Sequence, residues 1–369
     1  MTWSKVDTVL LEAIADGAFP GAVYLVTDRE RVLAERALGR QTYAPDAPVV
    51  TPDAMYDLAS LTKVVVSTTL AMIAYDRGLL DLDAPVTRYL PEFAGGGRER
   101  VTVRHLLTHS SGLRAWGALY ETCRSKEEIL RAICRIEPEA MPGTQAVYSD
   151  LGILLLGEIL ERLWNLEIDV VARREALDPL GMRDTMYRPP ASLLARIPPT
   201  EVRAIWREGL IHGEVHDENT AAMGGVAPHA GLFGTARDLG VFGRMMLNRG
   251  LHEGRRLIAA ETVDLFTRRA EGVPGSSRAL GWDTRSESGS SAGRRFSLRS
   301  YGHTGFTGTT IWIDPERGIG AVLLTNRVHP TRENLKIKEV RPTFHDAVVE
   351  AIETKQKFTT EGAEDAEKE

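Results

Sequence analysis

The chain has 369 residues, of which 43% are hydrophobic and 26% charged, and its formal net charge is −6. This length can bury a large core and exceeds the usual size of one domain, so we expect one composite domain or two lobes. The negative charge, and the lack of a basic run interleaved with aromatic residues, argue against nucleic acid as a partner. No apolar run approaches the ~20 residues of a membrane span. Small molecules are therefore the expected partners.

The first 40 residues predict a helix followed by a β-hairpin. Residues 1–14 have an amphipathic pattern in which acidic residues interrupt the apolar ones. A secretion signal needs an uninterrupted apolar segment, so we expect a cytoplasmic protein. Two apolar runs, 21–27 and 31–39, flank the polar segment 28–30, which is the pattern of a hairpin.

A serine and a lysine three residues apart, Ser60 and Lys63, precede an apolar stretch that runs to Tyr75. If this stretch is a helix, both side chains share one face at its N-terminus, where the backbone N–H of Ser60 is unpaired. A lysine can take the serine proton only if its pKa falls well below ~10.4. Because Ser-x-x-Lys also arises by chance, the pair needs support from other motifs.

Two further motifs supply that support. Tyr148-Ser149-Asp150 precedes an apolar helix, and a tyrosine there can hold its phenol toward a proton in transit. His303-Thr304-Gly305 precedes two apolar runs, 311–314 and 319–326, which predict a second hairpin. The glycines around this motif let a substrate or a backbone approach the edge strand.

Three weaker patterns have competing interpretations. Ser291 lies in a Gly-x-Ser-x-Gly match, but the surrounding loop is polar, so a catalytic role is disfavoured. His105 and His109 have the spacing of zinc ligands but no glutamate between them, which favours a structural role. His216 and Asp217 lie in a polar segment, where they either line a cleft or lock a long loop by hydrogen bonds.

The predicted elements indicate an α/β (α+β) fold, in which an antiparallel sheet flanked by helices joins a mainly helical lobe. Residues 1–59 and 236–358 form the predicted sheet lobe, and residues 60–235 form the helical lobe. A final helix is expected around residues 340–353. Residues 359–369 lack an apolar period and are expected to form a disordered acidic tail. The motifs then meet at a cleft between the two lobes.

The motifs near residues 60, 150 and 300 occur in the order and approximate spacing of the penicillin-recognising serine hydrolases. The chain therefore resembles the class C β-lactamase and low-mass penicillin-binding protein superfamily, which also contains D-amino-acid peptidases and esterases. It is most similar to a penicillin-binding-protein-like or esterase branch. Secondary matches at 104–113, 229–239 and 280–282 extend the resemblance over most of residues 8–330. The resemblance implies a β-lactamase/transpeptidase-like fold and chemistry without a cofactor or metal.

The resemblance also implies roles for the motif residues. Ser60 would attack an acyl carbonyl, Lys63 and Tyr148 would move its proton to the leaving group, and water would hydrolyse the acyl-enzyme. The backbone N–H groups of Ser60 and Phe306 would form the oxyanion hole. The predicted substrate-binding or supporting residues are Asp150, His303, Thr304, Gly305, His216 and Asp217.

Two motif positions depart from the β-lactamase pattern. Asp150 stands where many β-lactamases have asparagine, and a carboxylate touching Lys63 would raise the pKa of the lysine. Lys63 would then support Tyr148 as the base, unless Asp150 is protonated or turned away. His303 stands where most have lysine, and its imidazole would change charge near pH ~6.5 and hold a substrate carboxylate less firmly. Both departures argue against an efficient β-lactamase.

We therefore expect a serine hydrolase that acylates Ser60 and acts on a small ester or amide. It would be an esterase or a D-amino-acid or D-alanyl-D-alanine-type peptidase. One alternative is a β-lactamase or penicillin-binding protein with weak β-lactam turnover. An alternative of another class is a catalytically inactive binding module, although Ser60, Lys63 and Tyr148 are all chemically competent. The oligomeric state is left open.

Overall fold

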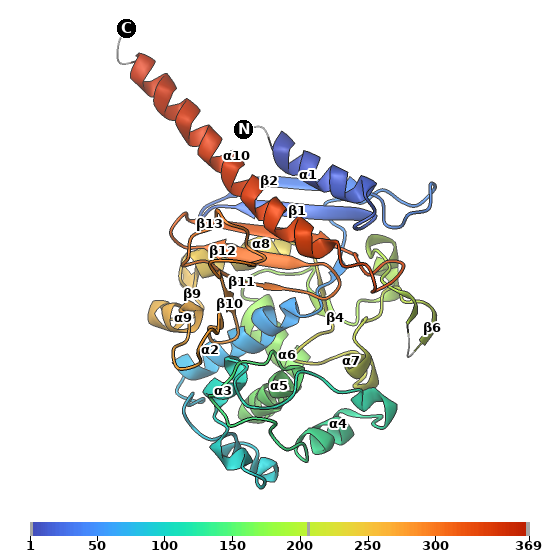
Figure 1. Ribbon diagram of the computed structural model, residues 1–369, viewed down its shortest axis with the longest axis vertical. Coiled ribbons are helices and arrows are strands. Elements are labelled where there is room, and N and C mark those ends of the chain that lie inside the picture. Colours follow the sequence, from blue (N-terminus) through green and yellow to red (C-terminus); the bar gives the residue numbers. More distant parts are fainter. Residues whose placement is uncertain (1–2, 205–206, 367–369) are drawn as a thin grey trace.

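The computed structural model describes residues 3–204 and 207–366, and its centre is a six-stranded antiparallel sheet (Figure 1). The strand order is β10-β11-β12-β13-β1-β2, so the two ends of the chain meet in the middle of the sheet, where β13 pairs with β1. The strands are β1 (Gly21–Thr27), β2 (Val32–Gly39), β10 (Asp283–Thr284), β11 (Tyr301–Thr304), β12 (Thr310–Asp314) and β13 (Ile319–Thr325).

Helices cover both faces of this sheet. Helices α1 (Ser4–Ala15) and α10 (Ile337–Ala366) lie on one face and α8 (Ala236–Leu247) on the other (Figure 1). Side chains of β1 alternate between the two layers: Tyr24 packs in the cluster with α1 and α10, and Val23 packs in the cluster with α8. Every residue of β1 is buried for this reason, and the strand reads as a continuous apolar run.

Helices form most of the other half of the molecule. The Ser60 segment leads into a π-helical turn, Lys63–Thr68, which continues as α2 (Thr69–Asp76). Helix α5 (Asp150–Trp164) begins after Ser149, whose Oγ accepts a hydrogen bond from the N–H of Gly152 at 3.2 Å. The remaining helices are α3 (Val103–Leu107), α4 (Lys126–Ile133), α6 (Ile168–Ala172), α7 (Glu218–Ala222) and α9 (Ala260–Thr267). The remaining strands are β3 (Tyr56–Asp57), β4 (Met186–Tyr187), β5 (Val202–Ala204), β6 (Arg207–Leu210), β7 (Leu232–Gly234), β8 (Leu251–His252) and β9 (Arg255–Arg256).

The predicted fold class and both predicted hairpins are confirmed. The division into lobes at residues 59/60 and 235/236 stays a prediction, and one apolar cluster crosses it. This cluster joins Leu25 of β1, Leu70 of α2, Leu155 of α5 and Phe242 of α8. The sheet and the helices near the site therefore share one core.

The last helix is longer than the sequence pattern indicated. We expected it to end near Glu353 and to be followed by a disordered tail from residue 359, but α10 continues to Ala366. Residues 343–361 contain no proline or glycine, so nothing in them breaks the backbone hydrogen bonding once the helix has begun. Residues 367–369 lie outside the described residues. None of the helices described is long and apolar enough to cross a membrane.

Candidate active site

Ser60 lies on a tight turn between β3 and the helix that follows. The preceding residue, Ala59, has a left-handed backbone with φ of 46°. The buried Asp57 carboxylate accepts a hydrogen bond from the Ala59 N–H at 2.8 Å and holds this conformation. Strained backbone of this kind persists only where the surroundings hold it, and it often occurs at functional sites.

Lys63 contacts Ser60 from the first turn of the helix. Its side chain is 1% exposed, and its Nζ lies 2.9 Å from Ser60 Oγ, 3.0 Å from the His229 carbonyl oxygen and 2.8 Å from Asp150 Oδ1. An ammonium has three N–H donors and no acceptor. Two of these donors form hydrogen bonds with Ser60 Oγ and the His229 carbonyl, so the proton of the Ser60 hydroxyl must point elsewhere. Asp150 Oδ1 is within ion-pair distance but accepts no well-aligned hydrogen bond from the described residues.

The contact with Asp150 decides the charge of Lys63. Burial lowers the pKa of Lys63, but the Asp150 carboxylate and Tyr148 outweigh burial and raise the pKa above its usual value. The sequence left open whether Asp150 touches Lys63 or turns away, and the two side chains form an ion pair. The ion pair with Asp150 therefore favours the ammonium form of Lys63.

Tyr148 lies beside this pair. Lys63 Nζ is 5.1 Å from the centre of its ring, and the ring packs against His109 with 4.6 Å between centroids. The Tyr148 hydroxyl is buried and makes no well-aligned hydrogen bond with the described residues. Burial raises the pKa of Tyr148, and the Lys63 charge opposes that rise.

The two histidines with zinc-like spacing have structural contacts, as the sequence favoured. His109 Nδ1 accepts a hydrogen bond from the Ser149 N–H at 3.0 Å and so fixes the start of α5. His105 Nδ1 accepts one from the Thr102 N–H at 3.2 Å and closes the N-terminus of α3. Within residues 3–204 and 207–366, no group of three His, Cys, Asp or Glu side chains is placed to hold a metal ion.

The His303-Thr304-Gly305 segment runs along the opposite wall. Strand β10 pairs only with Tyr301 and Gly302, so the end of β11 has a free edge toward the cleft. A Cβ on Gly305 would lie 2.0 Å from Thr309 Oγ1 and 2.6 Å from the Leu58 carbonyl oxygen. Only glycine lets this strand end come so close to the Ser60 turn.

This close approach brings two backbone donors together. Thr307 Oγ1 donates to the Asp57 carbonyl at 2.7 Å, and Thr309 Oγ1 donates to the Leu58 carbonyl at 3.0 Å. The N–H groups of Ser60 and Phe306 have no hydrogen-bond acceptor among the described residues. The two donors are therefore available to an oxygen bound beside Ser60 Oγ, which fits the predicted oxyanion hole.

The surroundings of His303 favour its neutral form, whereas from the sequence we expected a change of charge near pH 6.5. Its Nδ1 lies 2.9 Å from the Thr304 carbonyl oxygen, an acceptor, so Nδ1 carries the proton and Nε2 keeps a lone pair. Burial, together with the charges of Lys63 and Arg278, lowers the pKa of His303 well below 6.5. The side chain is 3% exposed, and its motif gave no indication of this burial.

His216 and Asp217 do both things that the sequence left open. They line the cavity, and they also lock its loops. The His216 N–H donates to Asp57 Oδ2 at 2.8 Å, and Asp217 Oδ1 accepts from the Thr220 N–H at 2.7 Å at the start of α7. Asp217 Oδ1 also lies 3.1 Å from His229 Nε2, next to the carbonyl that contacts Lys63.

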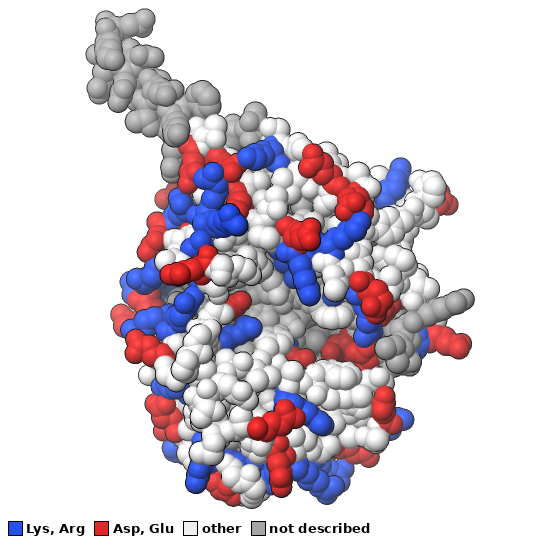
Figure 2. All heavy atoms as spheres, in the orientation of Figure 1, with Lys and Arg blue, Asp and Glu red and all other residues white. Residues whose placement is uncertain are grey.

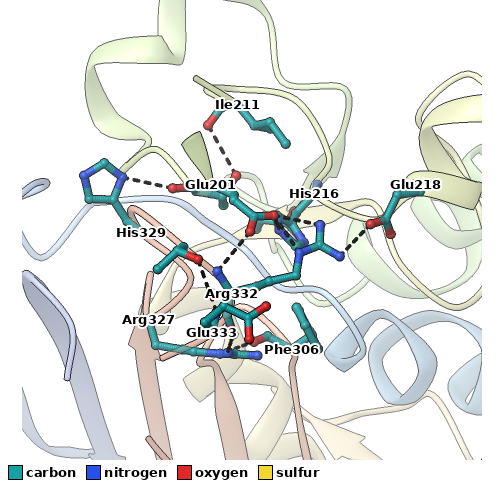
Figure 3. Close-up of polar contacts among 12 residues, drawn as sticks. Glu201, Ile211, His216, Glu218, Phe306, Arg327, His329, Arg332 and Glu333 are labelled. Carbon is teal, nitrogen blue, oxygen red and sulfur yellow. Dashed lines mark hydrogen bonds and ion pairs between the residues drawn. The ribbon is translucent and has the colours of Figure 1, made fainter. Parts of the chain in front are cut away.

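An ionic network holds the far side of the cavity (Figure 3). Glu201 accepts hydrogen bonds from His216 Nε2 at 2.9 Å and from Arg332 Nε at 2.8 Å, and Arg332 also pairs with Glu218 at 2.7 Å. Burial raises the pKa of Glu201, but His216 and Arg332 outweigh it and lower the pKa to about 2. This network fixes the chain next to the exposed Phe306 ring, which stacks on His216.

These groups surround a cavity of about 660 Å³. Figure 2 shows the hollow in this face of the molecule, with basic side chains at its border. The lining residues include Ser60, Trp116, Tyr148, Asp150, His216, Asp217, His229, Arg278, His303, Thr304, Gly305, Phe306, Arg327, Arg332, Lys338 and Arg341.

The model of the family described as Beta-lactamase matches residues 6–341. The chain belongs to the Beta-lactamase family. The resemblance inferred from the three motifs is thereby confirmed, and the protein is a serine hydrolase of this family.

Two curated relatives match most of this β-lactamase-family chain. An N-acetylmuramyl-L-alanine amidase of Bacillus subtilis is 33% identical over 366 residues, covering 88% of this chain and 81% of the relative. A putative D-alanyl-D-alanine carboxypeptidase of Escherichia coli (strain K12) is 31% identical over 353 residues, covering 85% and 80%.

Solved structures share the fold of this β-lactamase-family protein. EstCE1, a hydrolase with promiscuous acyltransferase activity, superposes with a TM-score of 0.76 at 23% identity, covering 94% of this chain and 98% of that one. A class C β-lactamase from Rhodobacter sphaeroides gives a TM-score of 0.72 at 22% identity, covering 95% and 99%.

Several cavity residues of this β-lactamase-family hydrolase were missed by the sequence analysis. Arg278 lies with its guanidinium 5.1 Å from the centre of the Tyr148 ring, and none of the described carboxylates forms an ion pair with it. Its one sequence signal was its place next to the secondary match at 280–282. Arg332 and Arg341 line the cavity, and Glu201 does not line it but holds Arg332. None of the three had a sequence signal, because each reaches the site only through the fold.

Proposed function

We propose that this hydrolase cleaves a small amide bond through an acyl-enzyme on Ser60. The observation that carries the proposal is the contact of Ser60 Oγ with Lys63 Nζ at 2.9 Å. It is combined with the backbone N–H groups of Ser60 and Phe306, which have no acceptor among the described residues. The nucleophile and the oxyanion donors then act on the same carbonyl.

In this proposal Tyr148 moves the proton. Lys63 donates to Ser60 Oγ, so the Ser60 proton is free to pass to the Tyr148 oxygen as Oγ attacks the carbonyl carbon. In the same concerted relay Tyr148 passes its own proton to the leaving nitrogen, so its oxygen never carries two protons, and the C–N bond then breaks. The Lys63 charge stabilises the negative charge that develops on both oxygens. Water then hydrolyses the acyl-enzyme and restores Ser60.

We further propose that the substrate carries a carboxylate near the leaving group. Arg278 lines the cavity beside Tyr148 and His303, without an ion-pair partner among the described residues. His303 is neutral, so Arg278 supplies the positive charge that a lysine at position 303 would have given. The names of the two curated relatives support amides derived from peptidoglycan, whose amino-acid parts carry carboxylates.

We also propose that the protein acts in the cytoplasm on such small compounds. Val6 and Leu10 of the first helix are fully buried in the layer with α10, which supports α1 as a permanent part of the fold.

Two pairs of substrates test this proposal, one built on N-acetylmuramyl-L-alanine and one on an acylated D-alanyl-D-alanine. Within each pair the second compound has a carboxamide in place of the terminal carboxylate. We expect turnover of the compound with the carboxylate in at least one pair. Arg278→Gln should raise the KM for that compound about tenfold, because a charge-assisted hydrogen bond is lost. The KM of the matching carboxamide should change less than twofold. Equal effects on both compounds, or no turnover of either pair, would contradict the proposed substrate class.

A further inference from the structure

The peptide bond between Gly305 and Phe306 is held from its carbonyl side. The Gly305 carbonyl oxygen accepts a hydrogen bond from Arg341 Nη2 at 2.6 Å and another from the Gly308 N–H at 3.1 Å. The N–H of Phe306, at the other end of the same planar peptide group, is the available donor beside Ser60. Arg341 therefore acts on the peptide that would bind the oxyanion.

Arg341 is an unusual arginine. It lies on α10, its residue is 9% exposed, and no described carboxylate forms an ion pair with it. Its Nη2 also donates to the Thr309 carbonyl at 2.9 Å, and its Nε has no partner among the described residues. Burial and the nearby charge of Arg327 lower the pKa of Arg341 to about 9. A buried cation without a counter-charge destabilises the fold, so a role that needs the charge is favoured.

The charge has a specific effect on a peptide group. Hydrogen bonds in a chain polarise one another, and a bond from an ionised donor is roughly twice as strong as a neutral one. A guanidinium on the Gly305 oxygen draws electrons toward that oxygen and leaves the Phe306 N–H more positive. It also fixes the plane of the peptide, so that the N–H needs no reorganisation when an oxyanion forms.

We propose that Arg341 is a positioning residue that orients and polarises the Phe306 N–H of the oxyanion hole. The proposal rests on the proposed function, because it needs an oxyanion at Ser60. Arg327 has a different role, since its Nε donates at 2.7 Å to the carbonyl of Phe306, which belongs to the next peptide group. Of these two arginines, Arg341 is therefore the one that acts on the peptide that supplies the donor.

The test uses Arg341→Met, Arg341→Lys and a matched control, Arg98→Met, in the full-length protein. Arg98 is half-buried and holds the carbonyls of Phe93 and Ala94 at 3.0 and 2.9 Å in the helical half, away from the cavity. Each variant is assayed for kcat and KM with p-nitrophenyl acetate, for the Ki of phenylboronic acid, and for melting temperature. The boronate adduct of serine mimics the tetrahedral intermediate and places an oxygen in the oxyanion hole.

We expect Arg341→Met to lower kcat and to raise the boronate Ki by the same factor, roughly 10 to 30-fold, with KM within threefold of wild type. This is less than the ~10²-fold or more lost when an oxyanion donor is removed outright. Arg341→Lys keeps a charge near the carbonyl and should recover most of both losses. If Arg341→Met does not fold, the same measurements on Arg341→Lys test the inference. Arg98→Met should change only the melting temperature.

Two results would overturn the inference. If both Arg341 variants bind phenylboronic acid as wild type does and change only the melting temperature, Arg341 is merely structural while the proposed function stands. If Ser60→Ala binds the boronate as tightly as wild type, the adduct does not form on Ser60. In that case the proposed function fails, and the role of Arg341 fails with it.

Discussion

At the scale of single residues, the state of the site depends on the charge of Lys63. A neutral lysine would take the Ser60 proton directly, but the Asp150 carboxylate lies 2.8 Å away and favours the ammonium. Lys63 Nζ also donates hydrogen bonds to Ser60 Oγ and to the His229 carbonyl, as an ammonium does. Both observations support our proposal that Tyr148, and not Lys63, receives the proton.

Replacing Asp150 by asparagine tests this assignment through the pH dependence of kcat/KM. Asp150 raises the pKa of Lys63 and burial lowers it, so without the carboxylate the pKa should fall below the ordinary 10.5. Activity that needs the ammonium persists below the pKa of Lys63 and is lost as the pH rises through it. Asp150→Asn should therefore lose activity at a lower pH than wild type.

An unchanged pH profile in Asp150→Asn would contradict the coupling of Asp150 to Lys63. A gain of activity as the pH rises through the Lys63 titration would instead identify neutral lysine as the base. Melting temperature is the control, because a buried ammonium left without its partner costs ~3–5 kcal/mol.

At this scale, a contact between residues close in sequence could be predicted. The charge of a side chain could not, because it depends on burial by segments far away in the sequence. Ser60 and Lys63 lie on one turn at the start of the helix, closed by a hydrogen bond from the Lys63 N–H to the Ser60 carbonyl, so their contact follows from a spacing of three. The neutral state of His303 follows from the walls around it, which are made by distant segments. The contact between Asp150 and Lys63 also joins distant segments, so the sequence left open whether Asp150 touches Lys63 or turns away.

At the scale of elements, the site lies where elements begin or end. Ser60 precedes the helix that continues as α2, Tyr148 precedes α5, and His303 lies at the end of β11. Each boundary has a local signal, such as the Ser149 cap or the glycines after β11, so these elements could be predicted from sequence. The packing of one boundary against another has no local signal.

Gly305→Ala tests the packing of β11 against the Ser60 turn. The added Cβ would meet Thr309 Oγ1 at 2.0 Å and the Leu58 carbonyl at 2.6 Å, and the backbone oxygen cannot move independently of the turn. We expect the strand end to shift away from Ser60, with a loss of ~10²-fold or more in kcat, comparable to the loss of an oxyanion donor.

Gly240→Ala is the matched control for that variant. A Cβ on Gly240 also meets a close atom, with Leu25 Cδ2 at 2.6 Å, and neither residue lines the cavity. Both variants should lower the melting temperature, and only Gly305→Ala should lower kcat. Equal kcat losses would attribute the effect to general destabilisation.

At the scale of the whole molecule, the cavity is assembled from segments separated by most of the chain. Glu201, between β4 and β5, pairs with Arg332, which follows the last strand (Figure 3). Arg341 on α10 donates to the Gly305 carbonyl in the turn after β11. The motifs and the sheet could be predicted because each is encoded within a few residues. The charged wall of the cavity could not, because its members have no common spacing and meet only through long-range packing.

The measurement that tests the central claim most directly is an intact-mass spectrum of the full-length protein after incubation with benzylpenicillin, with Ser60→Ala as the control. The account predicts an acyl adduct of one benzylpenicillin on the wild type, mapped to Ser60 and absent from the variant. Its turnover should be slow, because Asp150 and His303 both depart from the β-lactamase pattern. An adduct on the Ser60→Ala variant, or benzylpenicillin hydrolysis that this variant retains, would contradict an acyl-enzyme at Ser60.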